Sequence, residues 1–297
     1  METWKRTVYI SLVCVFCTAF GVSQLAPILP LYFHDLGVQT PEAMSLWSGL
    51  ATGATYIIVC LAAPFWGRVA DKKGRKITLI RSSFGMALCN ILIAFQTTPE
   101  GVVLIRLVQG LVSGFYSASI TLIASESPIE RTGWALGLLA SANLAGSLIG
   151  PLLGGYIADT VGIRNDFIIV GTLMGLAGVL ATIFIHENYV PQPNPEKLSI
   201  RKLKEQIPEF NSIVALCVAS FIYAICIMSL QPVISVYIKG IVPSDTENLA
   251  FIAGAVFSAM GIAQLMSSSP LGKLVDKIGP RKVLVAVSYT HLRAHET

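Results

Sequence analysis

The side chains that could do chemistry in this sequence are its few charged ones, and they gather most densely at residues 67–76. Asp71 can accept hydrogen bonds from the first amides of a helix and can pair with Arg75. Gly67 allows two helices to approach closely, and Gly74 allows a left-handed turn. Together with Lys76, these residues predict a charged turn between two helices. Such a turn either links helix ends through ion pairs or only sets the orientation of the chain in a membrane.

A second polar group, Arg106 and Gln109 followed by Gly110, lies inside an apolar run. An arginine at the centre of a membrane helix costs about 2.5–3.5 kcal/mol. We therefore expect Arg106 to face the interior of a helix bundle and to act on an ion or proton pathway. The alternative is an arginine that extends to the membrane surface, since the run begins only about six residues earlier.

Glycines spaced by four dominate the run that contains Gly146, Gly150, Pro151, Gly154 and Gly155. Small residues at this spacing let helices touch backbone to backbone. A proline inside the run removes a backbone hydrogen bond and bends the helix. Taken alone, the pattern is also compatible with an ordinary helix-packing face.

Near the end of the first apolar run stand Pro27 and Pro30, and then Asp35 beside His34. Asp35 is the acid nearest to this run, so it is a weak candidate for carrying a proton. The alternative that we favour is a solvated loop acid.

The six cysteines all lie in apolar runs, where cysteine packs as a small hydrophobic residue. Cys14 and Cys17 form a C-x-x-C pair without polar neighbours in the sequence, so packing is favoured over redox chemistry. The apolar segments contain no metal-ligand cluster, nucleophile elbow or phosphate loop. We expect no metal, no cofactor and no enzymatic activity.

The composition is that of a membrane protein. Hydrophobic residues make up 54% of the chain and charged residues 13%, with a mean hydropathy of +0.68. A soluble domain carries about 25% charged residues. A chain this apolar cannot cover itself with polar surface and must face lipid. The net charge of +4 is too small to indicate nucleic-acid binding.

Apolar runs long enough to cross a bilayer recur along the chain. The first is too long for a signal peptide. The predicted fold is therefore all-α, a polytopic membrane protein. We expect helices at 7–33, 44–66, 77–95, 101–124, 133–157, 165–185, 211–238 and 248–270, and the start of a ninth near Val283.

Basic residues are concentrated in alternate loops. One side has Lys5 and Arg6, the 67–76 turn and the segment 197–204, whereas the other has little beyond Arg164 and Lys239. The positive-inside rule then predicts a cytoplasmic N-terminus.

An internal repeat divides the chain into two halves. A shift of 205 residues places Gly67, Asp71 and Gly74 on Gly272, Asp276 and Gly279. We expect a six-helix bundle at 1–186, a cytoplasmic linker at 187–209 and a partial second bundle at 210–287.

The last ten residues, 288–297, do not fit this pattern. His291, Arg293, His295 and Glu296 arrive where the ninth helix would continue, and ionisable groups are costly there. The segment resembles a translated sequencing adapter, and the alternatives are a metal-binding histidine pair or a natural tail. We expect long reads of the source DNA past Ser288 to reveal further apolar segments.

These motifs resemble those of the major facilitator superfamily, over residues 1 to about 287. The match comprises the G-x-x-x-D-x-x-G-R-K turn, R-x-x-Q-G at Arg106 and G-x-x-x-G-P-x-x-G-G at Gly146. With the proline pair, they resemble the twelve-helix drug:proton antiporter group of bacterial multidrug efflux transporters. The resemblance implies that Asp71 meets a helix end of the opposite half and forms a charge relay with Arg75 and Glu126. The acid that several members place deep in the first helix is missing here, so the coupling acid is expected in helices 9–12.

The resemblance implies a monomeric transporter that exports amphipathic small molecules in exchange for protons, from a cavity between the two halves. A proton symporter that takes up a sugar or metabolite is the alternative, against which the glycine motif argues. A membrane-embedded enzyme or sensor is a third possibility, without support from the motifs. Because the cavity needs both halves, the fragment by itself is expected to be inactive.

Overall fold

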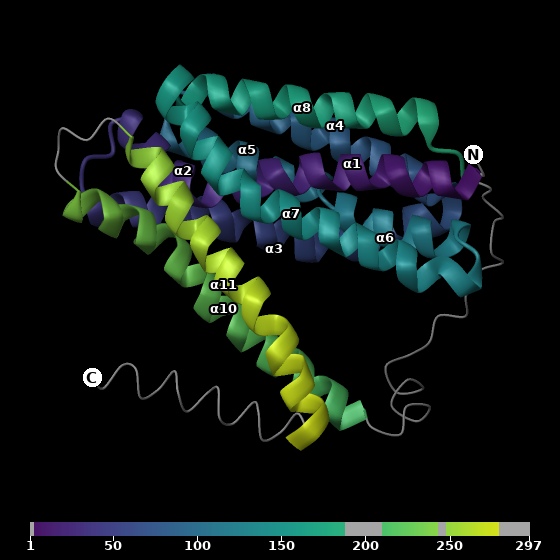
Figure 1. Ribbon diagram of the computed structural model, residues 1–297. Coiled ribbons are helices and arrows are strands. Elements are labelled where there is room, and N and C mark those ends of the chain that lie inside the picture. The colour runs from purple at the N-terminus through teal and green to yellow at the C-terminus, as the bar shows by residue number, and fades with distance from the viewer. Residues whose placement is uncertain (1–2, 188–209, 243–247, 279–297) are drawn as a thin grey trace.

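The computed structural model describes residues 3–187, 210–242 and 248–278. All regular structure in these residues is helical (Figure 1). The helices are α1 (Thr3–Ser23), α2 (Leu25–Asp35), α3 (Pro41–Lys73), α4 (Arg75–Ala94), α5 (Pro99–Val112), α6 (Phe115–Glu126), α7 (Ile129–Val161), α8 (Ile163–Phe184), α10 (Phe210–Ile241) and α11 (Leu249–Ile278).

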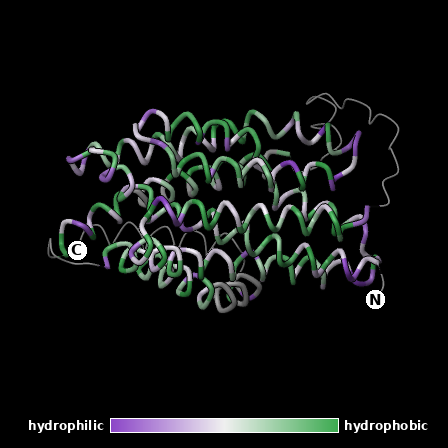
Figure 2. Tube along the Cα trace, turned by 90° about the horizontal axis from the view of Figure 1, so that it is seen from above, coloured by the Kyte–Doolittle hydropathy of each residue, from purple (hydrophilic) through white to green (hydrophobic). Residues whose placement is uncertain are grey.

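The helices carry the apolar surface of a membrane protein. Within the described residues, seven helical segments are long and apolar enough to cross a bilayer. Many large apolar side chains are exposed on them, including Leu61 at 71% and Leu104 at 63%. Figure 2 shows hydrophobic colour along the helices and hydrophilic colour mainly near their ends. The prediction of an all-α polytopic membrane protein is confirmed.

Two of the predicted helices are interrupted. The first divides at Gln24 into α1 and α2, because Pro27 has no amide to donate to the carbonyl of Ser23. The fourth divides into α5 and α6 at Gly114, whose φ of 115° is unfavourable for residues with a Cβ atom. Each interruption frees backbone groups inside a membrane helix, and these groups need other partners.

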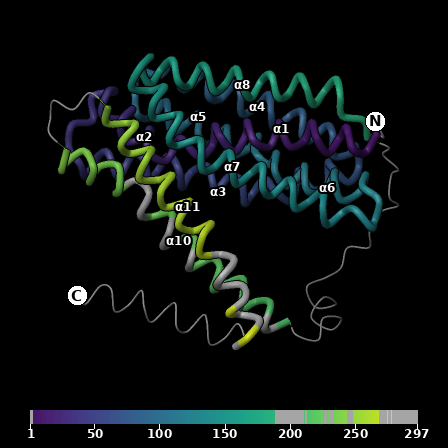
Figure 3. The backbone as a smooth tube through the Cα atoms, viewed as in Figure 1, coloured from purple at the N-terminus to yellow at the C-terminus, as the bar shows by residue number. Residues whose placement is uncertain are grey.

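Helices α1 to α8 form one bundle, in which α1 packs between α7 and α8, and α4 lies along α8. We call the end that holds the N-terminus and the α3–α4 turn the basic end, and the opposite end, with α2 and the α7–α8 turn, the far end. Helices α10 and α11 contact the bundle through α2, α3 and α7. Figures 1 and 3 show that they meet it at the far end and run away from it towards the basic end.

Candidate functional site

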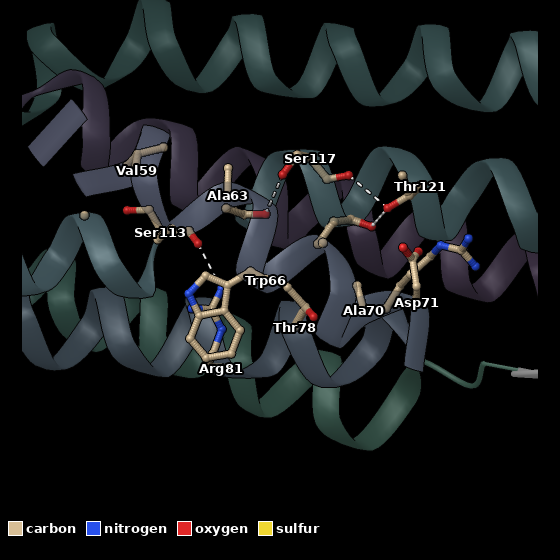
Figure 4. Close-up of a pocket in the computed structure, with 16 residues that line it drawn as sticks. Val59, Ala63, Trp66, Ala70, Asp71, Thr78, Arg81, Ser113, Ser117 and Thr121 are labelled. Carbon is tan, nitrogen blue, oxygen red and sulfur yellow. Dashed lines mark hydrogen bonds between the residues drawn. The ribbon is translucent and has the colours of Figure 1, made fainter. Parts of the chain in front are cut away.

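The predicted charged turn connects α3 and α4 at the basic end. Gly74 has a φ of 91°, as its expected left-handed role requires. Asp71 and Arg75 both line a partly open cavity of about 290 Å³ between α3, α4, α5 and α6 (Figure 4). Gly67 also lines this cavity and has no neighbouring atom within 4 Å of an added Cβ. Close helix contact at Gly67 is therefore not a feature of this conformation.

The start of α4 is capped by Glu187, which follows α8. Its carboxylate accepts hydrogen bonds from the amides of Arg75 at 2.7 Å and Lys76 at 2.8 Å. A carboxylate at a helix N-terminus is stabilised by the unpaired amides and by the helix dipole. Glu187 thus takes the capping position that the sequence had suggested for Asp71. The predicted linker begins at this residue, so its first residue is part of the bundle.

Glu126 is the last residue of α6 at the basic end, and it does not line the cavity of Asp71 and Arg75. The charge relay of these three residues stays a prediction.

At the interruption between α5 and α6, two side chains from other helices donate to the backbone carbonyls that lack helical partners. Arg81 of α4 donates to the carbonyl of Leu111 at 3.1 Å and to that of Ser113 at 2.9 Å. The indole of Trp66 on α3 also donates to Leu111, at 2.7 Å. The guanidinium lies 3.5 Å from the centroid of the Trp66 ring, a cation–π contact visible in Figure 4. Three membrane helices are thereby tied together at the wall of the cavity.

No sequence pattern distinguishes Arg81 from the other basic residues of the chain. Its two acceptors are free only because Gly114 interrupts the helix more than thirty residues later in the chain.

We expect Arg81→Ala to lower the thermal unfolding temperature of the detergent-purified protein, because the substitution leaves the carbonyl of Ser113 without a donor and that of Leu111 with the Trp66 indole alone. Hydrogen bonds to charged groups contribute about 1.5–3 kcal/mol each. Arg81→Lys should recover only part of this stability, since an ammonium group lacks the planar fork of arginine. Arg68→Ala, at an exposed position of α3, is the control. Equal unfolding temperatures for Arg81→Ala and Arg68→Ala would contradict the assignment.

Arg106 lies inside the bundle, with 6% of its surface exposed. Its Nη1 donates to Oε1 of Gln109 at 2.6 Å. Its carbonyl accepts from the hydroxyl of Thr55 on α3 at 3.0 Å, and an added Cβ on Gly110 would meet the carbonyl of Thr55. The interior position matches the first of the two sequence interpretations, and its role in an ion pathway stays a prediction.

The glycine motif of α7 lies where the bundle meets α11, and we call this contact between α7 and α11 the joint. Gly146 and Gly150 face α1, and Gly154 faces Gln24, which follows α1: a Cβ on Gly146 would lie 2.6 Å from the carbonyl oxygen of Phe16, and one on Gly150 would lie 2.5 Å from that of Phe20.

The next residue in the motif faces the other way. A Cβ on Gly155 would meet the carbonyl of Ala250 in α11, and one on Gly254 of α11 would meet the carbonyl of Pro151. Four glycines of one helix thus let α1 on one side and α11 on the other approach to backbone distance.

At the far end of this joint, Asp159 of α7 binds the start of α11. Its Oδ1 accepts from the amide of Ala250 at 3.1 Å and its Oδ2 from that of Phe251 at 2.7 Å. These amides belong to the first turn of α11 and have no acceptor within their own helix. Charge and dipole both favour the contact, which exists only while the far ends of α7 and α11 are joined.

Asp159→Asn should shift the protein towards a conformation with separated far ends. The loss of a charged acceptor at a helix N-terminus costs about 0.3–2 kcal/mol, which corresponds to a shift of up to about thirtyfold in a two-state equilibrium. We would measure the distance between spin labels at Val161→Cys and Asn248→Cys in a background in which the native cysteines are serine. Glu100→Gln, at an exposed position of α5 at the same end, is the control, and identical distance distributions in both variants would contradict the role of Asp159.

The other predicted positions are less closely connected with this site. Pro27 and Pro30 are buried in α2. Asp35 ends α2 with 58% of its side chain exposed, 3.8 Å from the imidazole of His34, which fits the solvated acid. Of the second-half repeat, Gly272 and Asp276 fall within α11, whereas Gly279 and the tail 288–297 lie outside the described residues.

Comparison with known proteins identifies the family of this chain. The family model described as Major Facilitator Superfamily matches residues 11–290. Multidrug resistance protein MdtG of Proteus mirabilis (strain HI4320) is 37% identical over 284 residues, which cover 96% of this chain and 70% of that protein. The protein of the same name from Dickeya zeae (strain Ech586) is 38% identical over 284 residues, which cover 96% and 69% of the two chains.

Solved structures share the fold at low identity. A bacterial homologue of the human lysosomal transporter Spinster, in an inward-facing and unoccupied conformation, superposes with a TM-score of 0.72 at 13% identity, over 95% of this chain and 64% of that one. The human organic anion transporter MFSD10 gives 0.62 at 16% identity, over 88% and 72%. The family match over most of the chain, the identity to the MdtG proteins and the shared fold establish that this chain belongs to the major facilitator superfamily.

Proposed function

We propose that this chain is part of a secondary active transporter that exports amphipathic drugs or similar compounds across the bacterial inner membrane in exchange for protons. The observation that carries the proposal is the position of the glycine motif, whose residues pack against α1 on one side and α11 on the other. A joint that changes its crossing angle between two bundles would let the protein open alternately to each side. The name of the MdtG relatives, multidrug resistance protein, supports drugs as the substrate class.

In the proposed orientation the basic end lies in the cytoplasm, as the positive-inside rule favours. The far ends of α7 and α11 are joined, and α10 and α11 run away from the bundle towards the basic end (Figure 1). The conformation is then open to the cytoplasm, the side from which an exporter takes up its substrate. The outward-facing conformation would have Asp71 against the opposite half, as the resemblance implies.

The proposal is tested by ethidium accumulation in cells that express the complete reading frame encoding this chain. An exporter lowers accumulation relative to cells with an empty vector, and collapse of the proton gradient by a protonophore should abolish the difference. Accumulation that stays low after the collapse would contradict proton coupling. Ethidium levels equal to the empty-vector cells would contradict the assignment to drug export, and substrate-driven proton uptake in vesicles would favour the symporter.

A further inference from the structure

Two polar side chains are fully buried beside the joint between α7 and α11. Gln24 occupies the interruption between α1 and α2, and Asp166 lies in the first turn of α8. Both have no exposed surface. The amide Nε2 of Gln24 donates to Oδ2 of Asp166 at 3.0 Å. Their positions are 142 residues apart in the sequence, and no motif of the chain includes either one.

One oxygen of each side chain lacks a partner among the described residues: Oδ1 of Asp166 and Oε1 of Gln24. A buried carboxylate that accepts a single hydrogen bond from a neutral amide is costly in its ionised form. Both unpaired atoms are acceptors, so a direct hydrogen bond between them requires a proton on one of them. A proton on Oδ1 can be donated to Oε1 while Oδ2 continues to accept from Nε2. The acid and the amide would then form a closed pair with two hydrogen bonds.

No cation compensates a charge on Asp166 among the described residues. On α8 itself, Arg164 is exposed and donates to the carbonyl of Gln96. Asp159 of α7 is bound to the amides of α11. The titratable groups at this end on the remaining neighbouring helices have other partners or lie on the surface; they are Tyr32, bonded to the carbonyls of Ile93 and Gln96, the exposed pair His34 and Asp35, and the exposed Glu100.

The pair is mechanically connected to the joint. An added Cβ on Gly154 would meet the side chain of Gln24, and the adjacent Gly155 faces Ala250 of α11. A change in the crossing of α7 and α11 therefore moves the helix surface on which Gln24 rests.

We propose that Asp166 and Gln24 form a proton-binding site, with Asp166 protonated in the conformation in which the far ends of α7 and α11 are joined. This inference rests on the proposed proton-coupled export and assigns its coupling acid within the described residues. In the outward-facing state the carboxylate takes a proton from water at the far end. The closed acid–amide pair then stabilises the conformation described here, and the proton is released to the cytoplasmic side before the next outward step.

The first test is infrared spectroscopy of the purified protein from the complete reading frame in lipid bilayers. The difference spectrum between wild type and Asp166→Asn at neutral pH should contain the carbonyl band of a protonated carboxylic acid. Asp35→Asn, an exposed acid at the same end, should leave this band unchanged. Absence of the band from the difference spectrum would overturn the inference. If Asp166→Asn does not fold, Gln24→Leu should shift the band, and an unshifted band would overturn the inference as well.

The second test is transport in proteoliposomes. Because asparagine resembles the protonated acid, Asp166→Asn should retain ethidium counterflow without a pH gradient and lose efflux driven by a gradient. Retention of gradient-driven efflux would refute the site. A wild-type protein that shows the carboxylic acid band but transports nothing would instead refute the proposed function and leave the proton site standing.

Discussion

Replacing Gly150 by alanine should destabilise the protein and abolish transport, whereas the same replacement at Gly137 of the same helix should do neither. A Cβ at position 150 would lie 2.5 Å from the carbonyl oxygen of Phe20 and against the hydroxyl of Ser23. A backbone atom of a packed helix cannot move aside without shifting the whole of α1. Overpacking of this kind costs about 1–3 kcal/mol, and a shift of α1 on α7 would also disturb the contact of α7 with α11 on its other side.

Gly137 makes the comparison informative because no atom lies within 4 Å of an added Cβ there. Alanine favours the helix over glycine by about 1 kcal/mol, so Gly137→Ala should leave the unfolding temperature unchanged or raise it. The two substitutions should therefore change the stability of the protein in opposite directions. The measurement is thermal unfolding in detergent together with ethidium efflux from cells. A Gly150→Ala variant as stable and active as Gly137→Ala would show that the glycine motif is not a packing joint.

Arg106→Leu should separate activity from stability, since it should abolish proton-coupled transport while leaving the unfolding temperature close to that of the wild type or above it. Arg106 is buried and bonded to Gln109. Arg106→Leu takes a costly buried charge out of the bundle and leaves only the neutral Oε1 of Gln109 without its donor, so the net change in stability should be small. An arginine that serves packing alone would therefore be dispensable for transport, whereas an arginine required by an ion pathway would be essential for it.

The partner of the arginine provides the matched control. Gln109→Leu removes the acceptor and leaves the guanidinium buried with one fewer hydrogen bond, which should cost about 1–3 kcal/mol of stability. We would compare unfolding temperatures and gradient-driven efflux of both variants. Wild-type transport by Arg106→Leu would contradict the predicted role, and a large loss of stability in this variant would assign the arginine to structure.

The sequence was a good guide to the features that depend on local patterns. The length of each apolar run predicted the membrane helices, and the spacing of Gly146, Gly150 and Gly154 predicted a face of close packing. The interior position of Arg106 followed from the cost of a charge in lipid. Each of these arguments needs only neighbouring residues.

The features that the sequence did not predict all depend on contacts between distant segments. Glu187 caps α4 from more than one hundred residues away in the sequence. Arg81 donates to carbonyls at the interruption of another helix, and Asp166 accepts a hydrogen bond from Gln24, 142 residues away. Nothing near these residues in the chain distinguishes them from solvated polar residues. The coupling acid was expected in helices 9–12 because the first helix lacks the acid that several family members place there, whereas Asp166 is now a candidate for it.

The most direct test of proton-coupled export uses inverted membrane vesicles from cells that express the complete reading frame. An imposed pH gradient, acidic inside, is followed with a fluorescent weak base, and ethidium is then added outside. An antiporter exchanges the external drug for internal protons, so the account predicts partial collapse of the gradient in wild-type vesicles and none in vesicles with Gly150→Ala. A gradient that ethidium leaves unchanged, while the vesicles accumulate the drug, would contradict proton exchange as the driving reaction.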